Sequence, residues 1–552
     1  MKKKVISMML CLSMAASVCA CGNTNSTSGT QSQTSETKES KATESAVESS
    51  TPSTEVKEDD SLYPVVDEPI TVTGVYVGAE EISDGRLVWD KVAEITGVNF
   101  EWISVDWETL PVYLASGDWD FDFIHYKDLD ATSINDYGVL GGKFADYNDY
   151  LEYMPHLQKT FEDYPEALKA VTESNGAIYR LPSVAISSTM TQIRPYYRTD
   201  ILGEAGIEVP TTTEEFYQAL KILKEKNGAP GWCPKGLKED GYFGGMLYSA
   251  FGPDVNPNFA DDGTGKVVYN RTSEQYKHYL EFMNKLYEEE LIDQEYLTVD
   301  WSYCLGLTQN GQTAFLGQEA HSLTEADFAD GKFHLSVLAP LTSEYSDDQE
   351  VLAQLPVSAN GFFLNAKSKN LVPLVQALDI MFATEEVVEG SGLLGQSFTY
   401  GLEGEHWQRN EDGTYETLLP EGVTGSYTDF QYDELIFANA GRATALEGYI
   451  TSTPGNGQAR QIGFRDNVFP YACDNSKAFP TNMLKFTTEE QDVITNKYTD
   501  IWNHMNEMKS KFITGVVDIE TGWDDYCKAF EQMGINDVLE VYQAAYDRWN
   551  QK

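Results

Sequence analysis

Residues 69–77 read PITVTGVYV, a stretch whose mainly β-branched side chains predict a strand. Apolar residues recur on one face of a predicted helix over 87–96, and Gly97 follows where a helix-ending glycine is expected. Two more strands are predicted over 98–105 and near 121–126. This alternation of strands and helices predicts a lobe of the α/β class, built on a parallel sheet.

The size and charge of the chain limit its possible functions. It has 552 residues, more than one hydrophobic core usually serves, so we expect two or more lobes. Its 87 acidic residues against 39 basic ones give a net charge of -48. A surface of this sign repels the phosphates of nucleic acids, so we expect no nucleic-acid partner.

The middle and the end of the chain are predicted to be rich in helices. At 212–215 and at 272–275 a Thr is followed three residues later by Glu or Gln, ahead of an apolar helical pattern. This spacing is typical of a capping box, which starts a helix. Two long helices are predicted over 489–512 and 524–549.

The N-terminus carries an export signal. Lysines at positions 2–4 precede an apolar run over 5–18 that is too short to span a bilayer, and a small residue stands before Cys21. This order resembles the lipobox of bacterial lipoproteins. The resemblance implies that residues 1–20 are a signal peptide and that Cys21 carries a lipid, which would hold the chain on the outer face of the cell membrane. An ordinary secretory signal with a chance cysteine is the alternative.

A disordered tether is predicted over residues 21–62. Between 22 and 60, 17 of the 39 residues are Ser or Thr, and none is Ile, Leu, Met or aromatic. Such a segment cannot bury enough apolar surface to offset the entropy lost on ordering. As a flexible coil it reaches roughly 35 Å.

Four cysteines lie beyond Cys21, at Cys233, Cys304, Cys473 and Cys527. They are widely spaced and form no CxxC pair, so a zinc site or a thioredoxin-like motif has no support. Two disulfides and four buried thiols both remain open.

Several short segments, in their order and spacing, resemble the lipid-anchored extracellular solute-binding proteins that serve ABC sugar importers. The segments are 114–118 (LASGD), 153–156 (YMPH), 175–182 (NGAIYRLP), 197–202 (YRTDIL), 206–212 (GIEVPTT), 311–315 (GQTAF), 401–407 (GLEGEHW) and 545–548 (AYDR). The resemblance covers nearly all of residues 69–550.

The resemblance implies a two-lobed, periplasmic-binding-protein-like fold of type II. Lobe 1 would take residues 63–183 and 345–397, and lobe 2 would take 184–344 and 398–552. Crossing segments would join the lobes, with the ligand cleft between them. Closure of such a cleft about a hinge is a known transition of this kind of receptor.

The same resemblance implies the substrate-binding lipoprotein of an ABC transporter. It would work as a monomer that captures a carbohydrate, an oligosaccharide in our expectation, and delivers it to the permease subunits. We expect no enzymatic activity and no cofactor. A surface lipoprotein that hydrolyses glycans, and the same fold with a peptide as ligand, are the alternatives.

Candidate ligand-binding residues are aromatic or polar and lie near predicted strand ends, turns or motif segments. Aromatic rings stack on the apolar faces of sugars, while carboxylates and amides bind the hydroxyls. The candidates are Glu80, Glu81, Asp118, Trp119, Tyr126, Tyr197, Arg198, Trp232, Trp301, Gln318, Glu319 and Arg465.

Sequence motifs give little support for a catalytic site or a metal site. The chain has no HExxH, GxSxG or P-loop motif. A GxGxxG match at 390–395 follows a predicted helix instead of a strand, which argues against dinucleotide binding. Asp254, Asn256 and Asn258 resemble part of a calcium loop, but Phe259 stands where its glycine is required. We therefore expect no catalytic residue and no metal.

Overall fold

The computed structural model describes most of the chain beyond the predicted tether. The described residues are 62–78, 87–117, 119–126, 129–185, 195–234, 244–252, 258–317, 323, 327–347, 349, 357–359, 361–409, 415–418, 441–443, 463, 466–471, 479–481 and 483–551. The predicted signal peptide and Cys21 lie outside them. The chain divides into units 1–60 and 61–552, and the described residues all belong to the second. Within these ranges, no helix has the length and apolarity needed to cross a bilayer.

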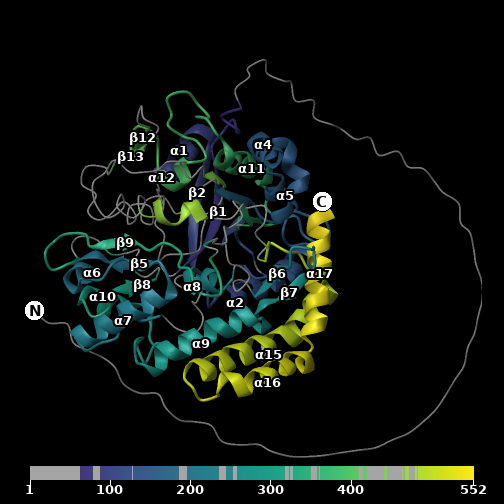
Figure 1. The fold of residues 1–552 in the computed structure, drawn as a ribbon. Coiled ribbons are helices and arrows are strands. Elements are labelled where there is room, and N and C mark those ends of the chain that lie inside the picture. Colours follow the sequence, from purple (N-terminus) through teal and green to yellow (C-terminus); the bar gives the residue numbers. More distant parts are fainter. Residues whose placement is uncertain are drawn as a thin grey trace, which may run out of the picture. The chain divides into compact units, whose positions relative to one another are not determined.

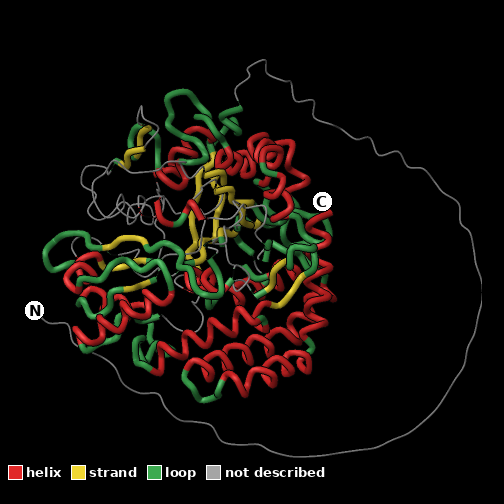
Figure 2. The backbone as a smooth tube through the Cα atoms, viewed as in Figure 1, coloured by secondary structure: helices red, strands yellow, loops and turns green. Residues whose placement is uncertain are grey.

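The first sheet is built around β1 (Ile70–Val77), the strand that the opening stretch predicts (Figure 2). β1 pairs in parallel with β2 (Val98–Val105) and with β3 (Phe123–His125). β11 (Phe363–Leu364) pairs antiparallel with β3, which gives the order β11-β3-β1-β2. α1 (Leu87–Thr96) joins β1 to β2 and packs on β2. The predicted parallel α/β arrangement is confirmed.

The first core lies on both faces of this sheet. Val72 and Phe123 pack on one face with Trp89 of α1, whereas Val75 and Ile124 pack on the other face. Because successive side chains of a strand point to opposite faces, this alternation buries β1 on both sides. The remaining helices and strands of this part are α2 (Leu110–Ser116), α3 (Ala131–Ile134), α4 (Pro155–Asp163), α5 (Pro165–Val171), α11 (Leu371–Asp379), α12 (Ser397–Tyr400), β12 (Trp407–Arg409) and β13 (Tyr415–Thr417).

The second core surrounds another sheet, in which β5 (Tyr196–Arg198) lies between β8 (Phe315–Leu316) and β9 (Leu335–Val337). Two of its C-terminal helices, α15 (Thr488–Ile513) and α16 (Ile519–Met533), lie beside α9 (Glu274–Glu288) (Figure 1). Its other elements are α6 (Thr199–Ala205), α7 (Thr213–Asn227), α8 (Gly244–Phe251), β6 (Phe259–Asp261), β7 (Val267–Tyr269), α9 (Glu274–Glu288), α10 (Trp301–Gln309), α15 (Thr488–Ile513), α16 (Ile519–Met533) and α17 (Ile535–Gln551).

The helix boundaries correct the sequence analysis at two places. The capping box of α7 is present, because the Thr212 hydroxyl accepts the Glu215 N–H at 3.1 Å while the Glu215 carboxylate accepts the Thr212 N–H at 3.2 Å. For α9, however, Ser273 is the cap in place of the expected Thr272. The long helix predicted over 524–549 is also wrong. Gly534 adopts a left-handed conformation (φ 86°) that ends α16 before α17 begins.

A third sheet consists of three short strands from distant parts of the sequence. β4 (Pro182–Ala185) pairs antiparallel with β10 (Val357–Ala359) and in parallel with β14 (Gly441–Ala443). We call it the crossover sheet because two of its strands connect the two cores. β4 leads from α5 of the first part to β5 of the second core, and β10 leads from β9 of the second core back to β11 of the first sheet.

A small apolar cluster packs against the crossover sheet. Val184 of β4 and Val357 of β10 pack with Ala167 and Ala170 of α5. Trp549, near the end of α17, packs against the same cluster, and the Lys169 ammonium lies 5.7 Å from the centre of its ring. The end of α17 therefore contacts the apolar cluster that packs against the crossover sheet.

Asp379 ties α11 to α4 within the first core. Its carboxylate accepts the backbone N–H groups of His156 at 3.0 Å and of Leu157 at 2.8 Å, which begin α4 and have no partner within that helix. Burial raises the pKa of Asp379 to about 7, and the two N–H groups lower it by less.

We predict that Asp379 makes the protein less stable as the pH rises. A carboxyl whose folded-state pKa lies above its unfolded value stabilises the fold fully below pH 3.8, and this contribution is lost as the pH rises through about 7. The contribution is at most about 4 kcal/mol for a shift of this size. Urea unfolding between pH 4 and pH 8 should show a smaller decline for D379N than for the wild type, since the amide stays neutral. Parallel declines in the two proteins would contradict the prediction.

Candidate functional site

Three strand ends meet at one edge of the first sheet. β1, β2 and β3 run in parallel, so their carboxyl ends lie together, and the Gly78 N–H still donates to the Val105 carbonyl at 3.1 Å. We call the residues that follow these strands the carboxyl edge; they are Gly78, Asp106, Trp107 and Tyr126. In open α/β sheets ligands bind outside the carboxyl ends of the strands.

Aromatic residues stand at the carboxyl edge or next to it, where Trp107 follows β2, Tyr126 follows β3 and Tyr76 is the second-last residue of β1. Trp107 is 57% exposed although it is a large apolar residue. Asp106 holds it there, because the Asp106 carboxylate accepts the Glu108 N–H at 2.7 Å and so fixes the turn after β2. The ring of Tyr76 lies over Gly78, where an added Cβ would be 2.5 Å from the ring. Tyr126 is half-buried. This edge therefore offers ring faces to a ligand.

Behind these aromatics lies His125, the last residue of β3. It is 7% exposed, and its ring stacks on Phe362 with centroids 4.5 Å apart. Its Nδ1 atom is buried and has no hydrogen-bond partner within the described residues. Burial lowers the pKa of His125 to about 4, so the imidazole is neutral near pH 7.

Gly361 brings the chain from the crossover sheet directly against this edge. A Cβ at position 361 would lie 1.8 Å from the carbonyl oxygen of Tyr126, so a side chain there would collide with backbone. Gly361 stands two residues after β10. The end of a crossover strand and the end of β3 are consequently in contact.

Of the candidates in the first core, the structure describes Trp119 and Tyr126. Tyr126 lies on the carboxyl edge, as predicted from its place after a strand. Trp119 packs as part of the core, since its ring stacks on Phe121 at 5.2 Å and its Nε1 donates to the Leu114 carbonyl at 3.1 Å. Lys143 lies 5.1 Å above the same ring. Glu80, Glu81 and Asp118 lie outside the described residues.

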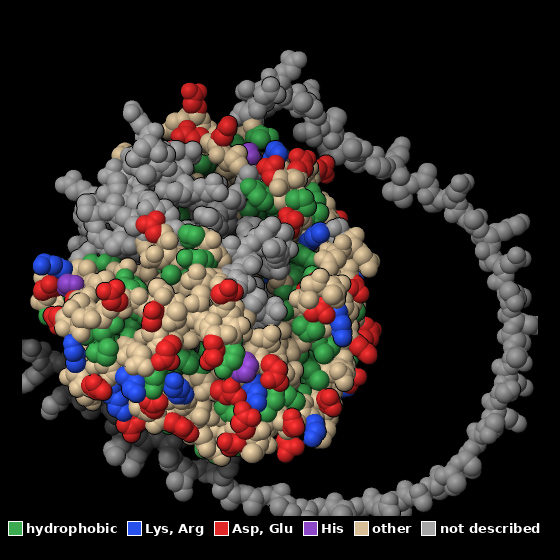
Figure 3. All heavy atoms as spheres, in the orientation of Figure 1, with side chains coloured by type: hydrophobic (Ala, Val, Ile, Leu, Met, Phe, Trp, Pro, Cys, Tyr) green, Lys and Arg blue, Asp and Glu red, His purple; other side chains and the backbone are tan. Residues whose placement is uncertain are grey.

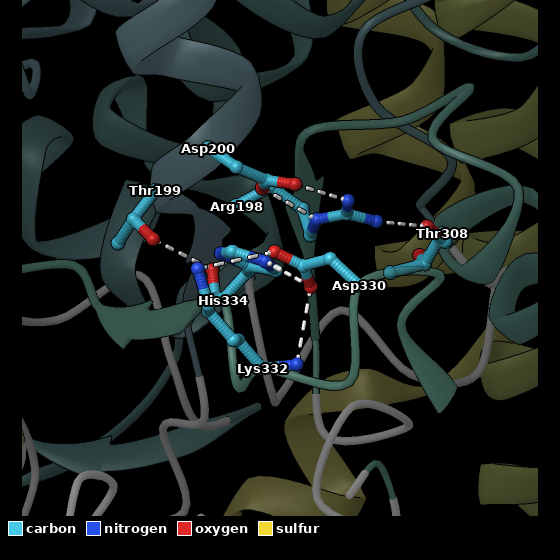
Figure 4. A network of polar contacts seen from close by, with 7 residues as sticks. All are labelled: Arg198, Thr199, Asp200, Thr308, Asp330, Lys332 and His334. Carbon is cyan, nitrogen blue, oxygen red and sulfur yellow. Dashed lines mark hydrogen bonds and ion pairs between the residues drawn. The ribbon is translucent and has the colours of Figure 1, made fainter. Parts of the chain in front are cut away.

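Tyr197 and Arg198 lie side by side in β5 of the second core. The Arg198 guanidinium donates to the Asp200 carboxylate, with Nε to Oδ1 at 2.8 Å, and to the Thr308 carbonyl at 2.5 Å (Figure 4). It also lies 4.9 Å from the centre of the Phe328 ring. Contacts within the chain thus explain why an arginine is buried here, and its role in ligand binding stays a prediction.

Asp200 completes this buried ion pair. Burial alone would raise the pKa of Asp200, but the hydrogen bonds and positive charge of Arg198 hold it below its ordinary value. A neighbouring network joins His334 and Lys332 to Asp330 (Figure 4), with His334 Nε2 at 2.8 Å from the carboxylate. The first network connects β5 to α10, and the second stabilises the loop before β9.

Trp232 was expected to face a ligand, and the structure instead places its ring in the second core. It is 2% exposed, its backbone bridges to Ile292 and Phe315, and its ring meets Phe216 edge-on at 5.6 Å. Trp301 begins α10, but its side chain is not among those described. Gln318, Glu319 and Arg465 also lie outside the described residues.

The structure adds residues that the sequence analysis missed. Trp107 lies on the carboxyl edge with Tyr126, and Tyr76, the second-last residue of β1, and His125, the last residue of β3, lie next to it. The second core instead holds Tyr197 and Arg198 in β5, together with Trp232. The signal for Trp107 was available, because it stands two residues after a predicted strand. In the described ranges no group of three His, Cys, Asp or Glu side chains could hold a metal ion.

Comparisons with known proteins agree with this architecture. A family model described as bacterial extracellular solute-binding protein matches residues 79–388, and a domain of unknown function matches 482–551. The chain is 24% identical over 498 residues (84% of it, 87% of the relative) to the fructooligosaccharide ABC transporter substrate-binding protein FusA of Streptococcus pneumoniae serotype 4. It is 26% identical over 465 residues (79% and 83%) to lipoprotein LipO of Bacillus subtilis.

The fold is also that of a solved structure. FusA of S. pneumoniae in complex with kestose superposes with a TM-score of 0.69 at 20% identity, over 87% of this chain and all of that one. The predicted two-lobed, periplasmic-binding-protein-like fold is confirmed.

We predict that Arg198 is required for stability. In R198A the partly buried Asp200 carboxylate loses the guanidinium that pairs with it, while the Thr308 carbonyl keeps only backbone donors such as the Gly311 N–H, so the free energy of unfolding should fall by about 2–3 kcal/mol. K332A is the matched control, because Lys332 is 77% exposed and 3.9 Å from Asp330, and it should unfold like the wild type. Urea titrations of the three proteins provide the comparison. An R198A protein as stable as K332A would show that the buried pair contributes nothing.

Proposed function

The chain belongs to the bacterial extracellular solute-binding proteins, and on that premise we propose that it captures an oligosaccharide and delivers it to the permease subunits of an ABC importer. The observation that carries the ligand class is the aromatic carboxyl edge. Sugar rings present apolar C–H faces and polar rims, which ring faces and nearby polar groups can match. Trp107, Tyr126 and Tyr76 would supply the ring faces. The names of the relatives point to the same class of ligand.

The charge of the chain favours an uncharged ligand. Acidic side chains are spread over the visible face and basic ones are few (Figure 3), and the net charge is -48. An anionic ligand would be repelled by such a surface. His125 fits a neutral ligand too, because its imidazole is uncharged near pH 7.

The two cores would correspond to two lobes. We propose lobe 1 as residues 63–183 and 345–397, extended to about 407 because Phe398 and Leu402 pack in the first core. Lobe 2 would take 184–344 and the C-terminal part. The crossover sheet would be the hinge, and ligand binding would favour the closed state. The support is that β4 and β10 carry the chain between elements of different cores.

We propose that a lipid on Cys21 holds the protein, as a monomer, on the outer face of the cell membrane. The lysines, the apolar run and the small residue before Cys21 support this, as does the printed name of LipO. The receptor would perform no chemistry on its ligand.

The proposal is tested by calorimetry of the exported protein with mono- and oligosaccharides and with short peptides. One glycan should bind saturably and be recovered intact. W107A should weaken its affinity roughly 30-fold, the effect of losing an anchor residue worth about 2 kcal/mol. V516A removes another exposed apolar side chain, beyond α15, and should bind like the wild type. Equal affinity of W107A would exclude the carboxyl edge as the site. Hydrolysis of the glycan, or binding of peptides alone, would overturn the function.

We predict that C21A releases the protein from the membrane, because the variant has no thiol to acylate. Fractionation of cells that express the full chain should find the wild type with the membrane and C21A in the medium or with its signal uncleaved. Incorporation of labelled palmitate into the wild type alone would identify the lipid. Membrane association of cleaved C21A would argue for an anchor elsewhere.

A further inference from the structure

Two cysteines of the second core are in contact. The Sγ atoms of Cys233 and Cys304 lie 3.2 Å apart, although 71 positions separate them in the chain. Each residue is 2% exposed. The structure shows them as two thiols in contact.

The backbone around Cys233 is fixed from both sides. The Gly231 carbonyl accepts the Ala314 N–H at 2.8 Å, and the Trp232 carbonyl accepts the Asp293 N–H at 3.0 Å. Trp232 also bridges to Ile292 and Phe315. Cys233 follows directly and has little freedom to move away from its neighbour.

α10, which carries Cys304, is fastened at both ends. Asp300 caps it by accepting the Tyr303 N–H at 2.8 Å, and Arg198 donates to the Thr308 carbonyl in its last turn (Figure 4). The Tyr303 hydroxyl donates to Asp293 at 3.2 Å. Asp293 therefore links the two segments, through its backbone N–H to the Trp232 carbonyl and through its carboxylate to the Tyr303 side chain.

We propose that Cys233 and Cys304 form a disulfide when the chain folds outside the cell. This inference rests on the extracellular location in the proposed function, since disulfides persist in oxidising surroundings. A disulfide needs the sulfur atoms about 2 Å apart, so the two Sγ atoms must approach by about 1 Å from their 3.2 Å contact. The thiol of Cys527 in α16 has a pKa raised to about 11 by burial and then by nearby carboxylates.

The bond forms by thiol–disulfide exchange with a disulfide oxidant, either a small molecule or a protein. The thiolate of one cysteine attacks the oxidant, which gives a mixed disulfide and releases one thiol. The thiolate of the other cysteine then displaces the second thiol. Two electrons and two protons leave with the two released thiols. Because both sulfur atoms are buried in the folded chain, the exchange takes place before the second core closes.

The disulfide would join the segment at Trp232 to the first turns of α10, where Trp301 stands. It closes a long loop, which removes entropy from the unfolded chain and stabilises the fold. For a protein of this size the melting temperature should rise by roughly 2–4 °C.

Peptide mapping of the full chain tests the proposal directly. Cells that express and export it are quenched with an alkylating reagent in a denaturant, so that buried free thiols also react, and the protein is digested with trypsin without reductant. The expected product joins peptide 227–235 to peptide 286–332, with a mass 2 Da below their sum, and a reductant separates them. C527A, which leaves the contact intact, should give the same product, and C304S should give peptide 227–235 alone.

The proposal would be overturned if both cysteines were found alkylated, and therefore as free thiols, in the exported protein and also after the protein had been refolded with oxidised glutathione. A bridge from either one to Cys473 or Cys527 would overturn it as well. The melting temperature gives a second readout that does not depend on ligand binding. Reduction before refolding should lower it by roughly 2–4 °C in the wild type and leave C233S/C304S unchanged. A disulfide without glycan binding would leave this inference standing and remove the proposed function.

Discussion

The parallel pairing of β1 with both β2 and β3 is the constraint on which the arrangement depends. It buries β1 on both faces, with Val72 on one side and Val75 on the other. It also directs three strand ends to one edge, so that Trp107 follows β2 and Tyr126 follows β3 at the edge where β1 ends, one residue after Tyr76. An antiparallel partner for β1 would send one of these ends to the opposite edge. The site is therefore a product of strand direction before it is a product of side-chain chemistry.

Local patterns predicted the elements that depend on near neighbours. The β-branched run of β1, the apolar face of α1 and the capping box of α7 each act within a few residues, and the structure reproduces them. The end of α16 at Gly534 was missed because a single glycine within a helical pattern of apolar residues does not by itself predict a left-handed backbone conformation.

The candidate site was less predictable, because burial depends on partners that are remote in sequence. Trp232 is in the core because Ile292, Phe315 and Phe216 surround it, and nothing near position 232 indicates this. Arg198 is held by Thr308, which lies 110 positions away. The place of Tyr126 at a strand end could be predicted because it is a local feature, whereas its contact with a ligand stays a prediction. Many other candidates lie outside the described residues, and they remain predictions.

The end of α17 has a consequence for anyone who adds a domain to this protein. Trp549, in the last turn of α17, packs against the cluster that contains Val184 and Val357 of the crossover sheet. A fluorescent protein fused after α17 would begin close to the segment that the receptor would use to close. Its emission, paired with a dye elsewhere on the chain, would report occupancy in real time. A rigid tag at the same position would hinder closure of the lobes, so an affinity tag is better placed in the predicted tether, between Cys21 and residue 62.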